Sequence, residues 1–243
     1  DRLGFGGSLA AELCAGVKLV REGGRMVTRV EELGVSLSKI EHGFKKIERC
    51  AEKDFASYDT DSVAELARKA SGSDIVQLRM YGVFLLGYLS ANSGEALHIL
   101  KKDVSRDNDW RVQEILAKSF DRYCRDTGYK RSLPVIDEWL RSDKPNVRRA
   151  VTEGLRIWTA REYFKDHPKE AIRRLSALRD DPSEYVRKSV GNALRDVSKK
   201  YPDLVRAELA TWNPSSRGVK QVYKLASRLM GVATQAAGEG EPR

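Results

Sequence analysis

Three similar stretches decide the fold class: Asp109-Trp110-Arg111-Val112-Gln113-Glu114, Pro145-Asn146-Val147-Arg148-Arg149-Ala150 and Pro182-Ser183-Glu184-Tyr185-Val186-Arg187-Lys188. In each stretch, a loop with Asp or Pro leads to a valine with a basic residue beside it, and an apolar helical pattern follows. The three valines, Val112, Val147 and Val186, are 35 and 39 residues apart. A two-helix period of about 40 residues is typical of HEAT-like repeats.

A second helical pattern completes each repeat, over residues 133–141, 171–179 and 203–211. One repeat cannot bury its own apolar stripe, so neighbouring repeats must stack on each other. We therefore predict an all-α fold of about twelve helices, a curved solenoid of HEAT-like repeats. The helices that follow the Val-Arg loops carry polar residues, and we expect them to line a concave, basic face. The alternative is that these residues are only the solvated side of each helix.

The rest of the chain also has helical periodicity. Helices are expected at 61–70, 73–88 and 94–102, and two less regular ones at 8–20 and 35–50, with a break at Gly23-Gly24. Residues 1–230 are predicted to form a single repeat domain. The Gly-, Ala- and Glu-rich stretch 231–243 is predicted to be a disordered tail.

The charge of the chain favours a polyanionic partner. Its 243 residues include 44 Lys and Arg against 35 Asp and Glu, a net charge of +9. Residues 141–200 hold 16 of the basic residues and 9 of the acidic ones, so most of the excess lies there. Nucleic acid is the first candidate for such a surface, and an ordinary solvated surface is the alternative.

Other classes of protein and site lack support in the sequence. No apolar run approaches the roughly 18 residues of a membrane span, and no secretory signal is visible, so a cytoplasmic protein is expected. The cysteines and histidines do not have the spacing of a zinc site, and there is no phosphate-binding glycine loop. We expect neither a metal nor a cofactor.

Residues 180–205 resemble the last-but-one repeat of the AlkC and AlkD alkylpurine DNA glycosylases. Their Ser-Val-x-Asn-x-Leu-x-Asp core, from Ser189 to Asp196, is closer to the AlkC pattern. Val147 to Gly154, with Trp158, is also similar to AlkC, whereas the spacing of Trp110 and Glu114 is similar to AlkD. The resemblance covers about residues 61–212. It departs from AlkD at Asn192, where those proteins have a second tryptophan, and at Glu114, where they have aspartate.

The resemblance implies excision of cationic alkylated purines from double-stranded DNA by a monomeric, nucleoid-associated enzyme. A carboxylate can stabilise the positive charge that develops on the sugar, and an indole can hold the cationic base by cation–π attraction. The candidate catalytic residues are Glu114, Asp196, Trp158 and Trp110. The structural alternatives are an i,i+4 pair between Glu114 and Lys118, pairing of Asp196 with Lys199 and Lys200, and tryptophans that pack in the core.

Several residues beside the Val-Arg loops are candidates for DNA contacts. Phosphate recognition uses guanidinium groups and helix N-termini, and the loops bring both together at each repeat. The candidates are Arg148, Arg149, Arg156, Arg187, Lys188, Asn192 and Arg195. An arginine here can instead link repeats by pairing with an Asp of the adjacent loop. Two functional alternatives also stay open: a nucleic-acid binder without catalysis and a scaffold for an acidic protein.

Overall fold

The computed structural model describes residues 25–213 and 215–230, which contain twelve α-helices, two short 3-10 helices and no strand. The predicted all-helical fold is confirmed. The chain divides into two compact units between Ser132 and Leu133. A single repeat domain over 1–230 stays a prediction, as do the curvature and the concave face. The helix expected at 8–20 and the tail 231–243 lie outside the described residues.

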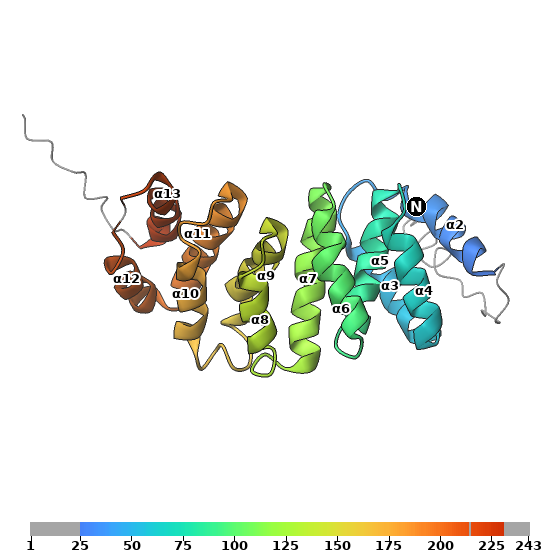
Figure 1. Cartoon of the computed structure of the whole chain (residues 1–243), viewed down its shortest axis with the longest axis horizontal. Helices are drawn as coiled ribbons and strands as arrows, with labels where there is room; N and C mark the ends of the chain where they lie inside the picture. The colour runs from blue at the N-terminus through green and yellow to red at the C-terminus, as the bar shows by residue number, and fades with distance from the viewer. Residues whose placement is uncertain (1–24, 214, 231–243) are drawn as a thin grey trace, which may run out of the picture. The chain divides into compact units, whose positions relative to one another are not determined.

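The first unit is built around one buried helix. Its elements are α2 (Arg25–Leu37), α3 (Lys45–Ser57), α4 (Thr60–Ser71), α5 (Val76–Leu89), α6 (Gly94–Lys102), the 3-10 turn η1 (Val104–Arg106) and α7 (Trp110–Thr127). Helix α5 contacts α2, α3, α4, α6 and α7 (Figure 1). Its side chains are buried almost without interruption from Leu78 to Leu89, because this segment is apolar on all sides. Gly82 allows α4 to approach, since an added Cβ would lie 2.5 Å from the Ser71 nitrogen.

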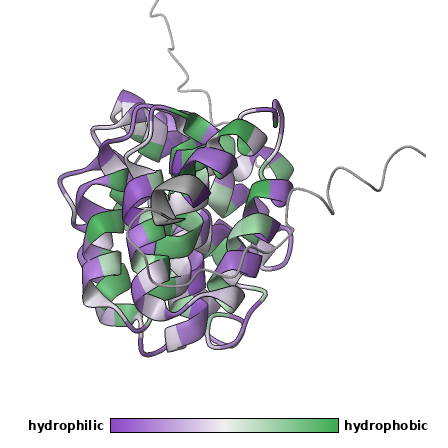
Figure 2. Cartoon of the chain, turned by 90° about the vertical axis from the view of Figure 1, so that its right-hand side faces the viewer, coloured by the Kyte–Doolittle hydropathy of each residue, from purple (hydrophilic) through white to green (hydrophobic). Residues whose placement is uncertain are grey.

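The second unit repeats a two-layer arrangement. Its elements are α8 (Leu133–Leu140), α9 (Pro145–Trp158), α10 (Pro168–Ala177), α11 (Glu184–Ser198), α12 (Pro202–Ala210), α13 (Arg217–Ala226) and η2 (Ser227–Leu229). Helices α9, α11 and α13 pack side by side in one layer, and α8, α10 and α12 pack against them from the other. Most helices visible in Figure 2 carry both hydrophobic and hydrophilic residues, as expected where one face of a helix is buried.

Local signals explain where most helices begin. Prolines 145, 168 and 202 occupy the first turn of α9, α10 and α12, where a missing N–H costs nothing. Asp59 caps α4 by accepting a hydrogen bond from the Ser62 N–H, so the predicted cap at Asp61-Ser62 was two residues late. The helix predicted at 35–50 is wrong: the chain leaves α2 after Leu37 and turns at Gly43, whose φ of 79° suits glycine.

An arginine in one repeat binds an aspartate in the loop of the next, once in each unit. In the first unit, Nε of Arg79 donates to Asp107 at 2.6 Å. In the second, Nε and Nη2 of Arg148 donate to the two carboxylate oxygens of Asp181 at 2.6 and 2.7 Å. In both cases the aspartate also accepts a backbone N–H two residues later, from Asp109 or Ser183, at 2.8 Å. The ion pair therefore shapes the turn from which the next helix begins.

The arginine at this helix position also binds the loop that precedes its own helix. The side chains of Arg79, Arg148 and Arg187 each donate to the backbone carbonyl six residues before them, those of Ser73, Ser142 and Asp181. Gln113 does the same to Asp107 at 2.8 Å. These part-buried bonds give the carbonyls of the turn a hydrogen-bond partner. At Arg148 and Arg187, the basic residue that follows the valine thus marks this structural position of the repeat.

None of the helices in the part of the chain that the structure describes is long and apolar enough to cross a membrane.

We predict that Asp181→Ala lowers the free energy of unfolding by about 3–5 kcal/mol, because it leaves the buried Arg148 guanidinium without its counter-ion. Asp203→Ala is the matched control, since Asp203 pairs with Arg206 on the surface of α12, and such pairs contribute about 0–1 kcal/mol. Urea denaturation of both variants measures the difference. An equal decrease in unfolding free energy for the two variants would show that the ion pair between repeats is no more stabilising than a surface pair.

Candidate functional site

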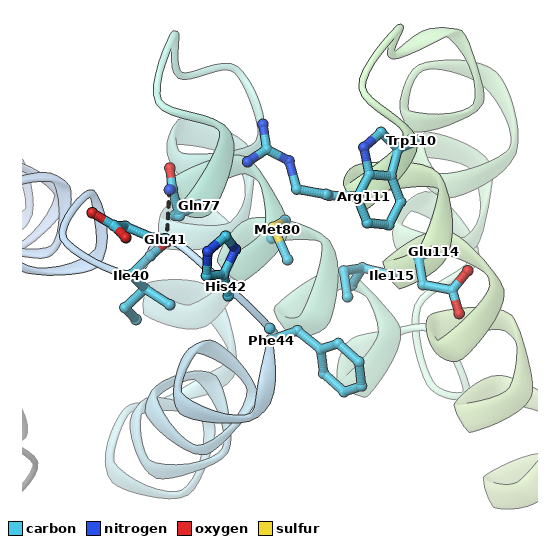
Figure 3. Close-up of a pocket in the computed structure, with 11 residues that line it drawn as sticks. Ile40, Glu41, His42, Phe44, Gln77, Met80, Trp110, Arg111, Glu114 and Ile115 are labelled. Carbon is cyan, nitrogen blue, oxygen red and sulfur yellow. Dashed lines mark hydrogen bonds between the residues drawn. The ribbon is translucent and has the colours of Figure 1, made fainter.

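A pocket of about 270 Å³ opens in the first unit, between α5, α7 and the segment that joins α2 to α3 (Figure 3). Its lining combines aromatic rings, apolar side chains and carboxylates. The lining residues are Ile40, Glu41, His42, Gly43, Phe44, Gln77, Met80, Trp110, Arg111, Glu114 and Ile115. Two of the four predicted catalytic residues, Trp110 and Glu114, therefore lie in one pocket.

The start of α7 positions the indole and the carboxylate of this pocket. Asp109 caps the helix, accepting from the Arg111 N–H at 2.9 Å and binding its guanidinium through both carboxylate oxygens. The side-chain hydrogen bond from Arg111 holds the pKa of Asp109 below its ordinary value, although partial burial opposes this shift. Trp110 is the first residue of the helix and is 70% exposed, and Glu114 follows one turn later on the same face.

The opposite wall comes from the segment between α2 and α3. The Gln77 side chain donates to the Ile40 carbonyl at 2.9 Å and so holds this segment against α5. His42 and Phe44 lie across the pocket from Trp110 and Glu114 in Figure 3. Phe44 also contacts Phe84 of α5, with ring centroids 6.3 Å apart. The wall is thus fixed by one hydrogen bond and one aromatic contact.

The pocket suits a flat, positively charged group. An indole attracts a cation over its face, by about 0.5–2 kcal/mol depending on solvation. A carboxylate one turn away adds a direct electrostatic attraction, which strengthens where apolar side chains such as Met80 and Ile115 exclude water. Neutral aromatic groups would gain the stacking but not the charge interaction. The geometry therefore favours cationic over neutral aromatic ligands.

Sequence reasoning missed the wall formed by His42, Phe44, Gln77 and Met80. The helix predicted over 35–50 placed Phe44 inside a regular element and not beside a turn. Gly43 was the available signal, because a glycine between polar residues and a basic stretch can mark a turn. Gln77 and Met80 carry no such signal, since α5 reads only as a buried helix.

In the second unit, a network of alternating charges joins α9 to α11. Arg149 stacks on the Tyr185 ring, with the guanidinium carbon 4.5 Å from its centroid, and pairs with Glu153 at 3.7 Å. Glu153 accepts from the Ser189 hydroxyl at 2.8 Å and pairs with Arg156 at 3.4 Å. Arg156 in turn donates to Asp196. Arg149, Arg156 and Asp196, which were predicted to contact DNA or to act in catalysis, thus lie in one network.

Asp196 is surrounded by cations. Besides Arg156, it pairs with Lys199 at 2.9 Å and Arg195 at 3.3 Å. Burial raises the pKa of Asp196, but hydrogen bonds from Lys199 and Arg156 outweigh it, and the pKa lies below its ordinary value. The structural alternative for this residue is confirmed for Lys199 only, since the Lys200 ammonium donates to the Thr159 carbonyl at 3.4 Å. Because Asp196 and Glu114 lie in different units, their convergence on one site stays a prediction.

Trp158 lies in the core, so the prediction that it forms a platform for a base is wrong. Its side chain is 0% exposed and stacks on Phe164 at a centroid distance of 5.6 Å. A Cβ added at Gly154 would lie 2.3 Å from the indole, which shows how closely the ring packs on the helix backbone. Trp158 therefore supports α9 from inside rather than facing a ligand.

Some of the residues predicted to contact DNA are buried or bonded within the fold, and others are accessible to solvent. Arg148 is buried in its pair with Asp181, so its assignment to DNA contact is wrong. Arg187 donates to the Gln221 side chain and to two loop carbonyls, so it links α11 to α13 through an amide and not through an aspartate of the adjacent loop. Lys188 is exposed and pairs with Glu184 at 2.8 Å. Asn192 lies partly buried on α11.

Among the residues that the structure describes, no group of three or more His, Cys, Asp and Glu is arranged to hold a metal ion.

We predict that Asp196 contributes stability that acid removes. Its folded pKa is lowered, so its contribution is fully present above the unfolded pKa of about 3.9 and is lost as pH falls through the folded value. The difference in unfolding free energy between wild type and Asp196→Asn should therefore shrink from pH 6 to pH 3, as measured by urea denaturation. A difference that is constant over this range would contradict the ion-paired state.

Comparison with known proteins identifies the family. The family model for the DNA alkylation repair enzyme matches residues 25–229. The crystal structure of AlkD2 from Streptococcus mutans is 56% identical, with a TM-score of 0.82, covering 84% of this chain and 98% of that one.

Two further relatives are more distant. The alkylpurine DNA glycosylase AlkC of Pseudomonas fluorescens, bound to DNA containing an abasic site analog, is 20% identical, with a TM-score of 0.62, and the match covers 91% of this chain and 61% of that one. It shares the fold. Protein YhaZ of Bacillus subtilis is 28% identical over 134 residues, which are 50% of this chain and 38% of YhaZ. The family match and the identity to AlkD2 together show that the chain belongs to the DNA alkylation repair enzyme family.

Proposed function

We propose that this protein is a DNA glycosylase that excises cationic N-alkylated purines, of the 3-methyladenine or 7-methylguanine type, from double-stranded DNA. The observation that carries the proposal is the placement of Trp110 and Glu114 in one pocket. Membership of the family and the fold shared with AlkC, which binds DNA containing an abasic site analog, support it. The enzyme would act as a monomer in the nucleoid.

The reaction needs little from the protein because the alkylated base is already a good leaving group. The bond between C1′ and the purine nitrogen breaks, and its electron pair neutralises the cationic base. Positive charge develops on the sugar at the same time, and the Glu114 carboxylate would stabilise it. Water then adds to C1′ and gives up a proton, which Glu114 can accept. Trp110 would hold the cationic base by cation–π attraction.

The second unit would supply contacts to the DNA backbone. Arg149, Arg156 and Arg195 lie on α9 and α11 and are held in place by Glu153 and Asp196. Fixed guanidinium groups lose less conformational freedom when they bind a phosphate. We assign Asp196 to orienting these arginines, because three cations already surround its carboxylate. Such phosphate contacts are independent of DNA sequence.

A non-catalytic DNA-binding protein is the second candidate. Its supporting observation is that Trp158 is buried and Asp196 is ion-paired, which leaves Trp110 and Glu114 as the predicted catalytic residues that line the pocket. Arg149, Arg156 and Arg195 would contact the phosphates of the DNA backbone equally well in such a protein. The two candidates differ only in whether the base is released.

We predict that Glu114→Gln slows base release about a hundredfold, equivalent to about 2.7 kcal/mol in the barrier, with little change in DNA affinity. The charge is lost while the shape is kept, so only the stabilisation of the cationic sugar disappears. Trp110→Ala should also slow release. The measurement is single-turnover excision from DNA containing 7-methylguanine, with circular dichroism as the check on folding.

Glu95→Gln on α6 is the matched control and should leave release unchanged, since this exposed carboxylate does not line the pocket. Wild-type release no faster than spontaneous loss would favour the non-catalytic candidate. Release that is rapid and unaffected by Glu114→Gln would keep the enzyme and remove Glu114 from its chemistry.

A further inference from the structure

We propose that Lys118 and Arg122 form a phosphate-binding strip that continues from the pocket along α7, and that the backbone of the strand whose base enters the pocket lies on it. This proposal rests on the proposed function, since it assumes that the ligand is DNA. Neither residue was expected from the sequence to contact DNA.

Spacing along α7 places the strip next to the pocket. Trp110, Glu114, Lys118 and Arg122 follow each other at intervals of four residues, which puts them in one row on the helix surface. The first two line the pocket and the next two lie beyond it. Each interval of four residues is slightly more than one turn, about 6 Å along the axis. Lys118 and Arg122 therefore lie about 12 and 18 Å along the axis from Trp110, where they can meet the phosphates of the nucleotides adjacent to one held at Trp110.

A row of aromatic rings lies beneath the two cations. The Lys118 ammonium is 4.3 Å from the centroid of Phe44, and the Arg122 guanidinium carbon is 4.9 Å from that of Tyr88. Phe84 joins these rings, at centroid distances of 6.3 Å to Phe44 and 6.4 Å to Tyr88. Phe44 also lines the pocket. The same ring therefore forms a wall of the pocket and a support for the first cation outside it.

The rings place the cations without neutralising them. A cation over an aromatic face keeps its full charge, and its N–H groups on the other side can donate to an anion. Arg122 is also held by Asp126, through an Nε bond of 2.5 Å, but a guanidinium has five N–H donors. Both side chains remain partly exposed. Because the rings restrict their motion, part of the entropy cost of binding a phosphate is met before the DNA arrives.

The salt dependence of DNA binding tests this strip. The slope of log K against log salt is negative, and each lost phosphate contact reduces its magnitude by about 0.9. We expect such a decrease for Lys118→Gln and for Arg122→Gln, measured by fluorescence anisotropy with a labelled undamaged duplex. Arg122→Lys keeps the positive charge, so this variant should have the same slope as the wild-type protein. Lys69→Gln on α4, which removes the same charge from a surface pair with Glu65, should leave the slope unchanged.

Slopes equal to wild type for both Lys118→Gln and Arg122→Gln would overturn the strip and leave the glycosylase proposal intact. A decrease of the same size in Lys69→Gln would also overturn it, since the effect would then come from net charge alone. Wild-type protein that shows no salt-dependent binding to DNA would overturn the strip together with the proposed function. Thermal melting of each variant checks that the fold is kept.

Discussion

The ion pair between an arginine of one repeat and an aspartate of the next loop is the constraint on which the site depends. Arg79 holds Asp107, whose carboxylate also accepts the Asp109 N–H, and Asp109 caps α7 immediately before Trp110. The position of the exposed indole is thus set by a contact that begins on α5. In the second unit, Arg148 and Asp181 fix the start of α11 in the same way. The same ion pair therefore stabilises the fold and positions the site, because the loop that links repeats is also the loop from which polar residues are presented.

The pocket is formed by the two helices that the Arg79–Asp107 ion pair connects, α5 and α7. Helix α5 is buried and supplies Gln77, which holds the segment from Ile40 to Phe44 in place. Helix α7 supplies the indole and the carboxylate. An open aromatic face beside a negative charge and apolar walls is an arrangement that distinguishes a cationic base from a neutral one by electrostatics rather than by shape. Such selection suits the repair of alkylated purines, whose damage introduces the charge.

The sequence predicted the repeat well and the site only in part. The period of the valines predicted the helices from α7 to α12, and helical periodicity predicted α4, α5 and α6, each to within a few residues, because helix boundaries there are marked by Asp, Ser and Pro. Helix α13 was not predicted, since no Val-Arg loop precedes it. Trp110 and Glu114 were found from their spacing. Trp158 and Arg148 were misassigned because a sequence pattern does not distinguish the buried from the exposed face of a repeat. The wall at Phe44 depends on a turn at Gly43 and on a tertiary hydrogen bond from Gln77, and neither is visible in a helical pattern.

The most direct test of a cation-selective pocket is the fluorescence of Trp110. The other tryptophans, at positions 139, 158 and 212, are 1%, 0% and 8% exposed, against 70% for Trp110, so quenching by a ligand in solution reports mainly on the pocket. We expect 7-methylguanosine, which is cationic, to quench the emission in a saturable way, and neutral guanosine to do so much more weakly. The difference should disappear in Glu114→Gln. Equal quenching by the two nucleosides in the wild-type protein would contradict the account.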